Sequence, residues 1–142
     1  LAVWLALRFG QGEPWLPYAA AIAAVLGHVW PVFHGFRGGK GAGTLVGALL
    51  VLWPVAVLVV LAAWLLVLTA TGYVGLSTVL AAAMLVPLAW FTGADDVRFG
   101  FAVLMAVFIV FTHRANLARL RAGTEARFER VRLWTRLRRK AA

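Results

Sequence analysis

The chain has 142 residues, of which 63% are apolar and only 13% are charged, and its mean hydropathy is +0.90. This composition is typical of an integral membrane protein and excludes an ordinary water-soluble domain. The absence of cysteine excludes disulfide scaffolds, thiol catalysis and cysteine-ligated metal sites. Of the 14 Lys and Arg residues, ten follow residue 113, so the net charge of +9 favours anionic lipid headgroups over nucleic acid as its partner.

Apolar runs set the expected fold. They cover residues 1–7, 15–33, 45–68, 73–91 and 99–111. A helix needs about 20 residues to cross the hydrocarbon core, so we interpret the first run as the end of a helix whose start is missing. A signal peptide would need a basic n-region and a small-residue cleavage site, which this run lacks. The sequence therefore predicts an all-α, polytopic membrane bundle, a single domain over residues 1–142 with about five full or short spans.

Charge predicts the orientation of the loops. Arg37 and Lys40 share one loop, and a basic tail covering residues 114–142 begins at Arg114. Positive residues collect on the cytoplasmic side, so both segments are expected there, with Asp95 and Asp96 on the other side.

Two loops on one side require an even number of crossings between them, whereas three apolar runs separate these two. One run must therefore be split. The run over residues 45–68 carries Pro54, which interrupts helices. We expect a short helix before Pro54 and a second helix after it, with the break sheltered by protein.

A glycine-dense segment, PVFHGFRGGKGAGT, occupies residues 31–44. Arg37 and Lys40 give it positive charge, and a helix is expected to follow it. Its glycines, which would leave backbone N–H groups open, are Gly35, Gly38, Gly39, Gly41 and Gly43. Open amides beside a helix N-terminus bind phosphate. A nucleotide P-loop is excluded, because a glycine follows Lys40 where that motif needs Ser or Thr. The alternative is close helix packing through a small-residue stripe formed by Gly35, Gly39, Gly43 and Gly47.

A second polar segment, HRANLARLRAGTE, follows the last apolar run at residues 113–125. His113 and Asn116 lie three positions apart and therefore share a helix face. Beside Arg114 and Arg119 they could bind a second phosphate or transfer a proton. Taken alone, this segment favours the alternative of a solvated helix next to the membrane. His28 is interpreted as a packing residue, since isolated histidines without carboxylates make a poor metal site.

The C-terminal segment alternates apolar and basic residues. Its apolar positions, Phe128, Val131, Trp134 and Leu137, recur at roughly helical spacing. This pattern predicts an amphipathic helix at the membrane surface. Nucleic-acid binding is the alternative, but no recognised binding motif accompanies the charge.

The two polar segments together resemble the PlsY family of bacterial acyl-phosphate:glycerol-3-phosphate acyltransferases. GHVWPVFHGFRGGKGAGT at residues 27–44 precedes HRANLARLRAGTE at residues 113–125, each at the end of a span. The resemblance implies an enzyme of phospholipid biosynthesis in the bacterial plasma (inner) membrane, with its active site facing the cytoplasm. Such enzymes move a fatty acyl group from acyl phosphate to the sn-1 hydroxyl of glycerol 3-phosphate, giving lysophosphatidic acid and inorganic phosphate. No cofactor is implied, because neither coenzyme A nor acyl carrier protein is the donor.

The resemblance also implies roles for single residues. The glycine-rich motif is associated with the acyl-phosphate group and maps to Gly38, Gly39, Lys40, Gly41 and Thr44, with Arg37 beside them. The His-x-x-Asn motif maps to His113 and Asn116, which share a segment with Arg114 and Glu125. We assign this segment to glycerol 3-phosphate. Lys40, His113 and Asn116 are the candidate catalytic residues, and no metal is expected. Whether His113 acts as a base stays open, because the phosphate leaving group can take the proton.

The resemblance is incomplete at the start of the chain. The family has an earlier motif rich in serine, glycine and asparagine, and nothing here matches it. The chain would begin within the family's second span, so it is either truncated or divergent, and we expect residues 1–142 alone to be inactive. Two other classes stay open: a small anion transporter, whose broken helices could present their ends to an anion, and a catalytically silent membrane scaffold.

Overall fold

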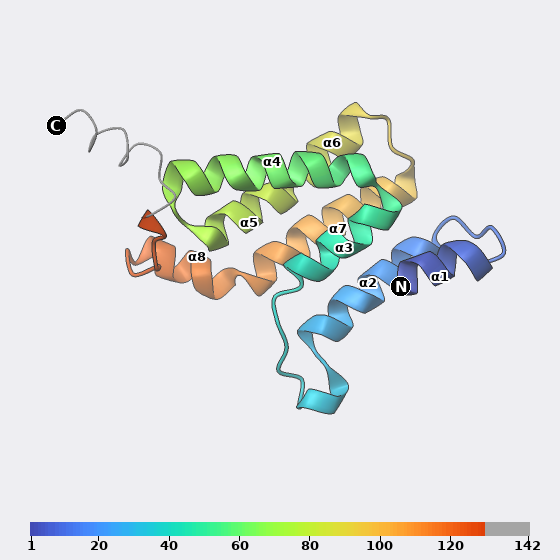
Figure 1. Ribbon diagram of the computed structural model, residues 1–142, viewed down its shortest axis with the longest axis horizontal. Coiled ribbons are helices and arrows are strands. Elements are labelled where there is room, and N and C mark those ends of the chain that lie inside the picture. Colours follow the sequence, from blue (N-terminus) through green and yellow to red (C-terminus); the bar gives the residue numbers. More distant parts are fainter. Residues whose placement is uncertain (130–142) are drawn as a thin grey trace.

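The computed structural model describes residues 1–129, which form helices joined by short connections. In chain order these are α1 (Ala2–Phe9), α2 (Leu16–Val29), the 3-10 helix η1 (Val32–His34), α3 (Ala42–Leu52), α4 (Pro54–Thr71), α5 (Val74–Ala83), α6 (Leu85–Phe91), α7 (Asp96–Thr112) and α8 (Arg114–Arg121). Within residues 1–129 there is no strand, so the predicted all-α bundle is confirmed (Figure 1). The expected amphipathic helix through Val131, Trp134 and Leu137 lies outside the described residues.

Several helices are long and apolar enough to cross a membrane. Three segments meet this criterion, Leu16–His34, Pro54–Thr71 and Val74–Phe91, and α7 with α8 makes a fourth if this pair, bent by 57°, counts as one span. At 1.5 Å per residue the 11-residue α3 is shorter than a span. The chain is an integral membrane helical bundle.

The bundle is apolar both inside and outside. Leu58, Leu66 and Phe91 are 69%, 71% and 85% exposed, respectively, as expected for side chains that face lipid. The fully buried positions include small residues, such as Ala21, Ala56, Ala89 and Ala102. Small interfacial residues let membrane helices approach closely, where van der Waals packing holds them together.

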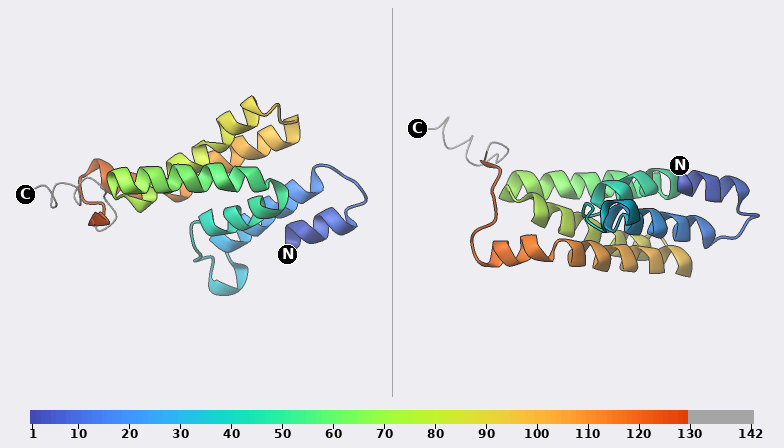
Figure 2. Two further views of the ribbon diagram at one scale, coloured as in Figure 1. Left: turned by 45° about the horizontal axis from the view of Figure 1, so that its top comes forward. Right: turned by 90° about the horizontal axis from the view of Figure 1, so that it is seen from below.

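The predicted break at Pro54 is confirmed. α3 ends at Leu52 and α4 begins at Pro54, with Trp53 between them. Proline is tolerated at the first helical position because the N–H it lacks would have no helical partner there. The two helices lie side by side after the break (Figures 1 and 2). This extra reversal brings the loop at residues 37–40 and His113 to the same end of the bundle, as the even number of crossings required.

A second break was not predicted. The apolar run over residues 73–91 is divided at Met84 into α5 and α6. Pro87 lacks the N–H that would donate to the carbonyl of Ala83, so the regular hydrogen-bond pattern is interrupted one turn earlier.

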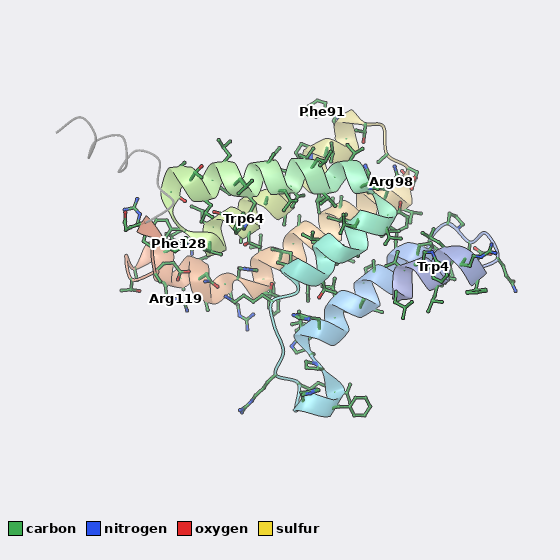
Figure 3. All side chains as sticks on the ribbon, in the orientation of Figure 1. Trp4, Trp64, Phe91, Arg98, Arg119 and Phe128 are labelled. Atoms are coloured by element: carbon green, nitrogen blue, oxygen red, sulfur yellow. The ribbon has the colours of Figure 1, made fainter. Side chains whose placement is uncertain are left out.

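The chain reversals gather at two ends of the bundle. One end holds the connection from α2 to α3, the turn from α4 to α5 and the junction of α7 with α8 (Figure 1). Arg119 and Phe128 lie at this end, whereas Phe91 and Arg98 lie at the other (Figure 3). The two polar motifs are therefore neighbours in space, although 68 residues lie between Thr44 and His113.

At the other end, Asp95 caps α7. One carboxylate oxygen of Asp95 accepts a hydrogen bond from the backbone N–H of Arg98 at 2.9 Å. We expect Asp95→Ala to lower the free energy of unfolding by about 1 kcal/mol, because a helix N–H loses its partner. Asp96→Ala is the matched control and should have a smaller effect. Denaturant unfolding in detergent micelles measures both, and equal losses would contradict the capping role.

Candidate active site

The glycine-rich loop depends on left-handed backbone at its two ends. Gly35 closes η1 at a φ of 60°, and Gly41 precedes α3 at a φ of 82°. A side chain disfavours this region, and a Cβ at Gly41 would also lie 2.9 Å from Cγ1 of Val25. Glycine at position 41 therefore lets the loop enter α3 tightly against α2.

Two of the glycine amides are not open. The N–H of Gly38 donates to the carbonyl of Val29, and the N–H of Gly39 donates to the carbonyl of His28, both at 3.2 Å. The prediction of free amides is wrong for these two residues, because the C-terminal carbonyls of α2 need partners. A Cβ on Gly39 would lie 2.3 Å from Nε2 of His28, so His28 is packed against the loop.

The small-residue stripe is also wrong as an explanation of the glycines. Gly35 and Gly39 lie outside the α-helices, and a Cβ added to Gly43 or Gly47 would meet nothing within 4 Å. Gly43 instead lies in the first turn of α3, whose N-terminus has no side-chain cap. The amides that can attract an anion are therefore those of the α3 first turn, where the helix dipole is positive.

Three cations line one cavity that is bordered by the glycine-rich loop and the end of α7. The cavity has a volume of about 500 Å³, and we call it the cationic cavity; its lining includes Arg37, Gly38, Gly39, Lys40, Thr112 and Arg114. Arg114 also donates to the carbonyl of Phe111 at 3.0 Å, and its guanidinium carbon lies 4.3 Å from the ring centroid of Phe111. The predicted residues Gly41 and Thr44 do not line this cavity, and Thr44 lies in the α3 first turn.

A hydrogen-bond network joins the two motifs. Lys40 Nζ donates to Asn116 Oδ1 at 2.5 Å, and Asn116 Nδ2 donates to Glu125 Oε1 at 2.6 Å. The other carboxylate oxygen of Glu125 accepts from Arg119 Nε at 2.7 Å. Thr112 holds the backbone of the same lysine, since its hydroxyl donates to the carbonyl of Lys40 at 3.0 Å. Lys40 thus borders both the cationic cavity and the Asn116 amide.

Glu125 is held as a carboxylate. Its side chain is 7% exposed, and the hydrogen bond from Asn116, followed by the contacts with Arg119, lowers the pKa of Glu125 below its usual value despite the opposing effect of burial. A lowered pKa means that the folded protein prefers the charged form. The resulting stabilisation is complete above the ordinary glutamate pKa of about 4.3 and is lost as the pH falls through the lowered value.

The lowered pKa of Glu125 predicts that the effect of Glu125→Gln on stability depends on pH. The substitution should lower Tm in detergent at neutral pH, because Arg119 loses its ionic partner. The difference in Tm from wild type should shrink as the pH falls below about 4, where the wild-type carboxylate is also protonated. The control is Glu13→Gln, because the wild-type Glu13 carboxylate accepts a hydrogen bond from the Trp15 indole but forms no ion pair within the described residues. A Glu125→Gln difference that stays constant from neutral to acidic pH would contradict the prediction.

His113 and Asn116 have different partners, although they lie three positions apart at the start of α8. His113 lies at the junction of α7 and α8, is buried, and directs Nδ1 to the carbonyl of Ile109 at 2.9 Å. A carbonyl only accepts, so Nδ1 carries the proton and Nε2 is the remaining acceptor of the neutral ring. His113 and Asn116 are close in sequence, but Asn116 contacts Lys40 and Glu125 whereas His113 contacts the end of α7.

Gly75 is a site residue that the sequence reasoning missed. It is buried on α5, and a Cβ there would lie 2.8 Å from Cβ and 3.0 Å from Cγ and Nδ2 of Asn116. The Asn116 amide therefore has room only because residue 75 has no side chain. A glycine in an apolar helix carries no local signal of this role.

The segment after Glu125 is tied to the turn between α4 and α5. Arg127 Nε donates to the carbonyl of Thr71 and the N–H of Phe128 donates to the carbonyl of Gly72, both at 2.8 Å. The Arg127 guanidinium carbon also lies 5.1 Å from the ring centroid of Tyr73. These contacts fix the chain two residues beyond Glu125. They therefore help to hold the Glu125 carboxylate within hydrogen-bonding distance of Asn116.

An apolar cavity opens beside the first turn of α3. Its volume is about 330 Å³, and its lining includes Ala42, Gly43, Leu49, Trp64, Leu85 and Ile109. Ala42 and Gly43 follow Lys40 closely in the chain. Along this loop, the lining of the cationic cavity ends at Lys40 and that of the apolar cavity begins at Ala42, so a charged site and an apolar chamber are close together along the chain, which suits a ligand with an anionic head and an apolar chain.

The sequence was compared with known families. The family described as glycerol-3-phosphate acyltransferase matches residues 1–123. The chain belongs to this family. Among its relatives, the glycerol-3-phosphate acyltransferase of Geobacter sulfurreducens is 40% identical, with 89% of the present chain and 65% of the relative covered. Those of Burkholderia pseudomallei and Chromobacterium violaceum are 42% and 39% identical, with 64% and 61% of their lengths covered. The chain therefore spans less than two thirds of these acyltransferases.

Two solved structures of the family share the fold. Both are crystal structures of PlsY, an integral membrane glycerol 3-phosphate acyltransferase, in its lysophosphatidic acid form and its glycerol 3-phosphate form. They match with TM-scores of 0.81 and 0.82 at 31% identity, over 89% of the present chain and 64% and 63% of theirs. The family and the fold expected from the two motifs are confirmed.

Proposed function

We propose that this chain carries the phosphate-binding and positioning residues of an enzyme that transfers a fatty acyl group from acyl phosphate to the sn-1 hydroxyl of glycerol 3-phosphate. The product would be lysophosphatidic acid, and inorganic phosphate would leave. The observation that carries the proposal is the contact of Lys40 with Asn116, because it joins the motif assigned to one phosphate substrate to the motif assigned to the other.

The arrangement of charges and cavities supports this division of work. The cationic cavity offers Arg37 and Lys40 to the phosphate of the donor, and Arg114, although its motif is assigned to glycerol 3-phosphate, lines the same cavity and would serve the donor instead. The apolar cavity next to α3 offers space for the acyl chain. On the far side of Lys40, the Asn116 amide and the Arg119–Glu125 pair would hold glycerol 3-phosphate with its hydroxyl toward the acyl carbon.

The reaction then needs few protein groups. The sn-1 hydroxyl oxygen attacks the acyl carbonyl carbon and forms the ester bond, while the bond from that carbon to the phosphate oxygen breaks and phosphate leaves with the electron pair. The hydroxyl proton ends on the departing phosphate. The burial of His113 and its contact with Ile109 favour a positioning role over that of general base. Holding two substrates in reactive geometry is itself a large source of rate.

The site would face the cytoplasm. The basic residues at the site end of the bundle, including Arg37, Lys40 and Arg114, favour the cytoplasmic face of a bacterial plasma membrane. Both polar substrates would then enter from the cytoplasm, and the acyl chain would stay in the leaflet.

The test is release of inorganic phosphate from acyl phosphate in lipid vesicles without coenzyme A. We compare residues 1–142 with a chimera in which the preceding segment of the Geobacter sulfurreducens relative is joined before Leu1. The chimera should release phosphate only when glycerol 3-phosphate is present, and residues 1–142 alone should be inactive. If the chimera releases no phosphate but carries anions across the membrane of sealed vesicles, the proposed acyltransferase function is wrong and the anion-transporter alternative is supported.

A further inference from the structure

The first half of the connection between α2 and α3 projects sideways from the bundle (Figures 1 and 2). We call residues 31–37 of this connection the knuckle. Three of its apolar side chains are exposed, since Val32, Phe33 and Phe36 present 67%, 97% and 60% of their surfaces. Contiguous apolar surface of this kind marks a place that contacts a partner or a membrane.

The knuckle is an ordered turn. Both His34 and Phe36 donate their N–H groups to the carbonyl of Pro31 at 3.1 Å, and the N–H of Arg37 donates to the carbonyl of His34 at 3.3 Å. Phe36 holds a φ of 59°, a region that bulky residues rarely occupy and that persists where surrounding contacts impose it. The turn therefore presents Phe33 outward in a defined conformation.

The neighbouring residues indicate which environment this surface fits. The apolar span that starts at Leu16 ends at His34, so the knuckle lies where the chain leaves the hydrocarbon core. Trp30 is held against the bundle by an edge-on contact with Phe108, at 5.6 Å between ring centroids. Aromatic side chains concentrate at this depth of a bilayer, and a nearby cation such as Arg37 favours anionic headgroups.

We propose that the knuckle docks into the lipid headgroup region at the site end of the bundle, with Phe33 inserted at the boundary with the acyl chains and Arg37 against the phosphates of anionic lipids. Bulk water fits this surface poorly because three apolar side chains would face it. The hydrocarbon core fits poorly too, because Arg37 and irregular backbone would lie in lipid. The proposal concerns where the knuckle sits, and its test does not measure acyl transfer, although Arg37 also lines the cationic cavity.

The absence of cysteine makes this directly testable. Phe33→Cys is labelled with an environment-sensitive fluorophore and the chain is reconstituted in phosphatidylcholine vesicles, with and without phosphatidylglycerol. We expect blue-shifted emission, stronger quenching by lipids brominated near the headgroup than by lipids brominated deep in the chains, and several-fold weaker quenching by aqueous iodide than at a label on Ala122→Cys. Ala122 is an exposed residue at the end of α8, so its label reports the aqueous side of the same end.

Two outcomes would overturn the proposal. A label at residue 33 that emits and is quenched by iodide like the label at residue 122 would place the knuckle in water. Stronger quenching by the deeply brominated lipids would place it in the hydrocarbon core. The role of Arg37 has its own test: phosphatidylglycerol should increase the shallow quenching in Phe33→Cys, and Arg37→Gln should abolish this increase. Equal quenching with and without phosphatidylglycerol would remove that role.

Discussion

Lys40→Ala is expected to lower kcat/KM of the chimera for acyl phosphate at least about tenfold. A charge-assisted hydrogen bond contributes roughly 1.5–3 kcal/mol, and tenfold corresponds to about 1.4 kcal/mol. Lys40 borders the cationic cavity and donates to Asn116, so its loss removes a cation from one substrate and a positioning contact from the other. Initial rates of phosphate release over a matrix of both substrate concentrations measure the effect.

Lys40→Arg separates charge from shape. It keeps the cation but replaces the compact ammonium by a planar guanidinium, so the KM for acyl phosphate should recover more fully than kcat. Arg8→Ala, far from the site on α1, is the control for a general loss of positive charge. If Lys40→Ala turned over like wild type, the assignment of Lys40 to the donor phosphate would fail.

Gly75→Ala is expected to reduce kcat/KM between about tenfold and hundredfold, although it removes no polar group. A Cβ at residue 75 would lie 2.8 Å from Cβ of Asn116, so the Asn116 side chain must shift away from Lys40 and Glu125. Displacements of about 1 Å near a reaction centre can cost about a hundredfold in rate. The same phosphate-release assay on the chimera measures it.

Two variants make this prediction specific to Asn116. Gly47→Ala adds the same methyl group to a helix where nothing lies within 4 Å, so it should leave the rate unchanged. In an Asn116→Gly background, Gly75→Ala should cost nothing further, because the two residues act through one contact. Equal losses in both backgrounds would show that Gly75→Ala acts by disturbing the packing of α5 instead.

Sequence reasoning predicted the features that depend on local chemistry. Pro54 marked the end of a helix because proline lacks an N–H, and that rule acts within one turn. The placement of Lys40 and the His113 segment on the same side followed from their positive charge, and counting crossings then required the split in the run over residues 45–68. The division at Met84 was missed, although Pro87 carries the same signal, because the apolar run of residues 73–91 fits a single span in length.

The parts of the site that escaped prediction depend on contacts between distant segments. Gly38 and Gly39 looked like open amides, but the end of α2 takes both N–H groups. Gly75 matters only because α8 places Asn116 against it, and Arg127 matters only because the chain after α8 returns to Thr71. No periodicity or motif in a single segment encodes such pairings.

Asn116 gives the network a single direction. Its amide donates to Glu125 and accepts from Lys40, so the side-chain hydrogen bonds that run from Lys40 through Asn116 both point toward one carboxylate. An aspartate at position 116 has nearly the same shape, but it carries no N–H, so it could not donate to Glu125 and would place two carboxylates side by side. Asn116 is therefore fixed by the direction of its hydrogen bonds and not by its size alone, because its amide accepts at one end and donates at the other.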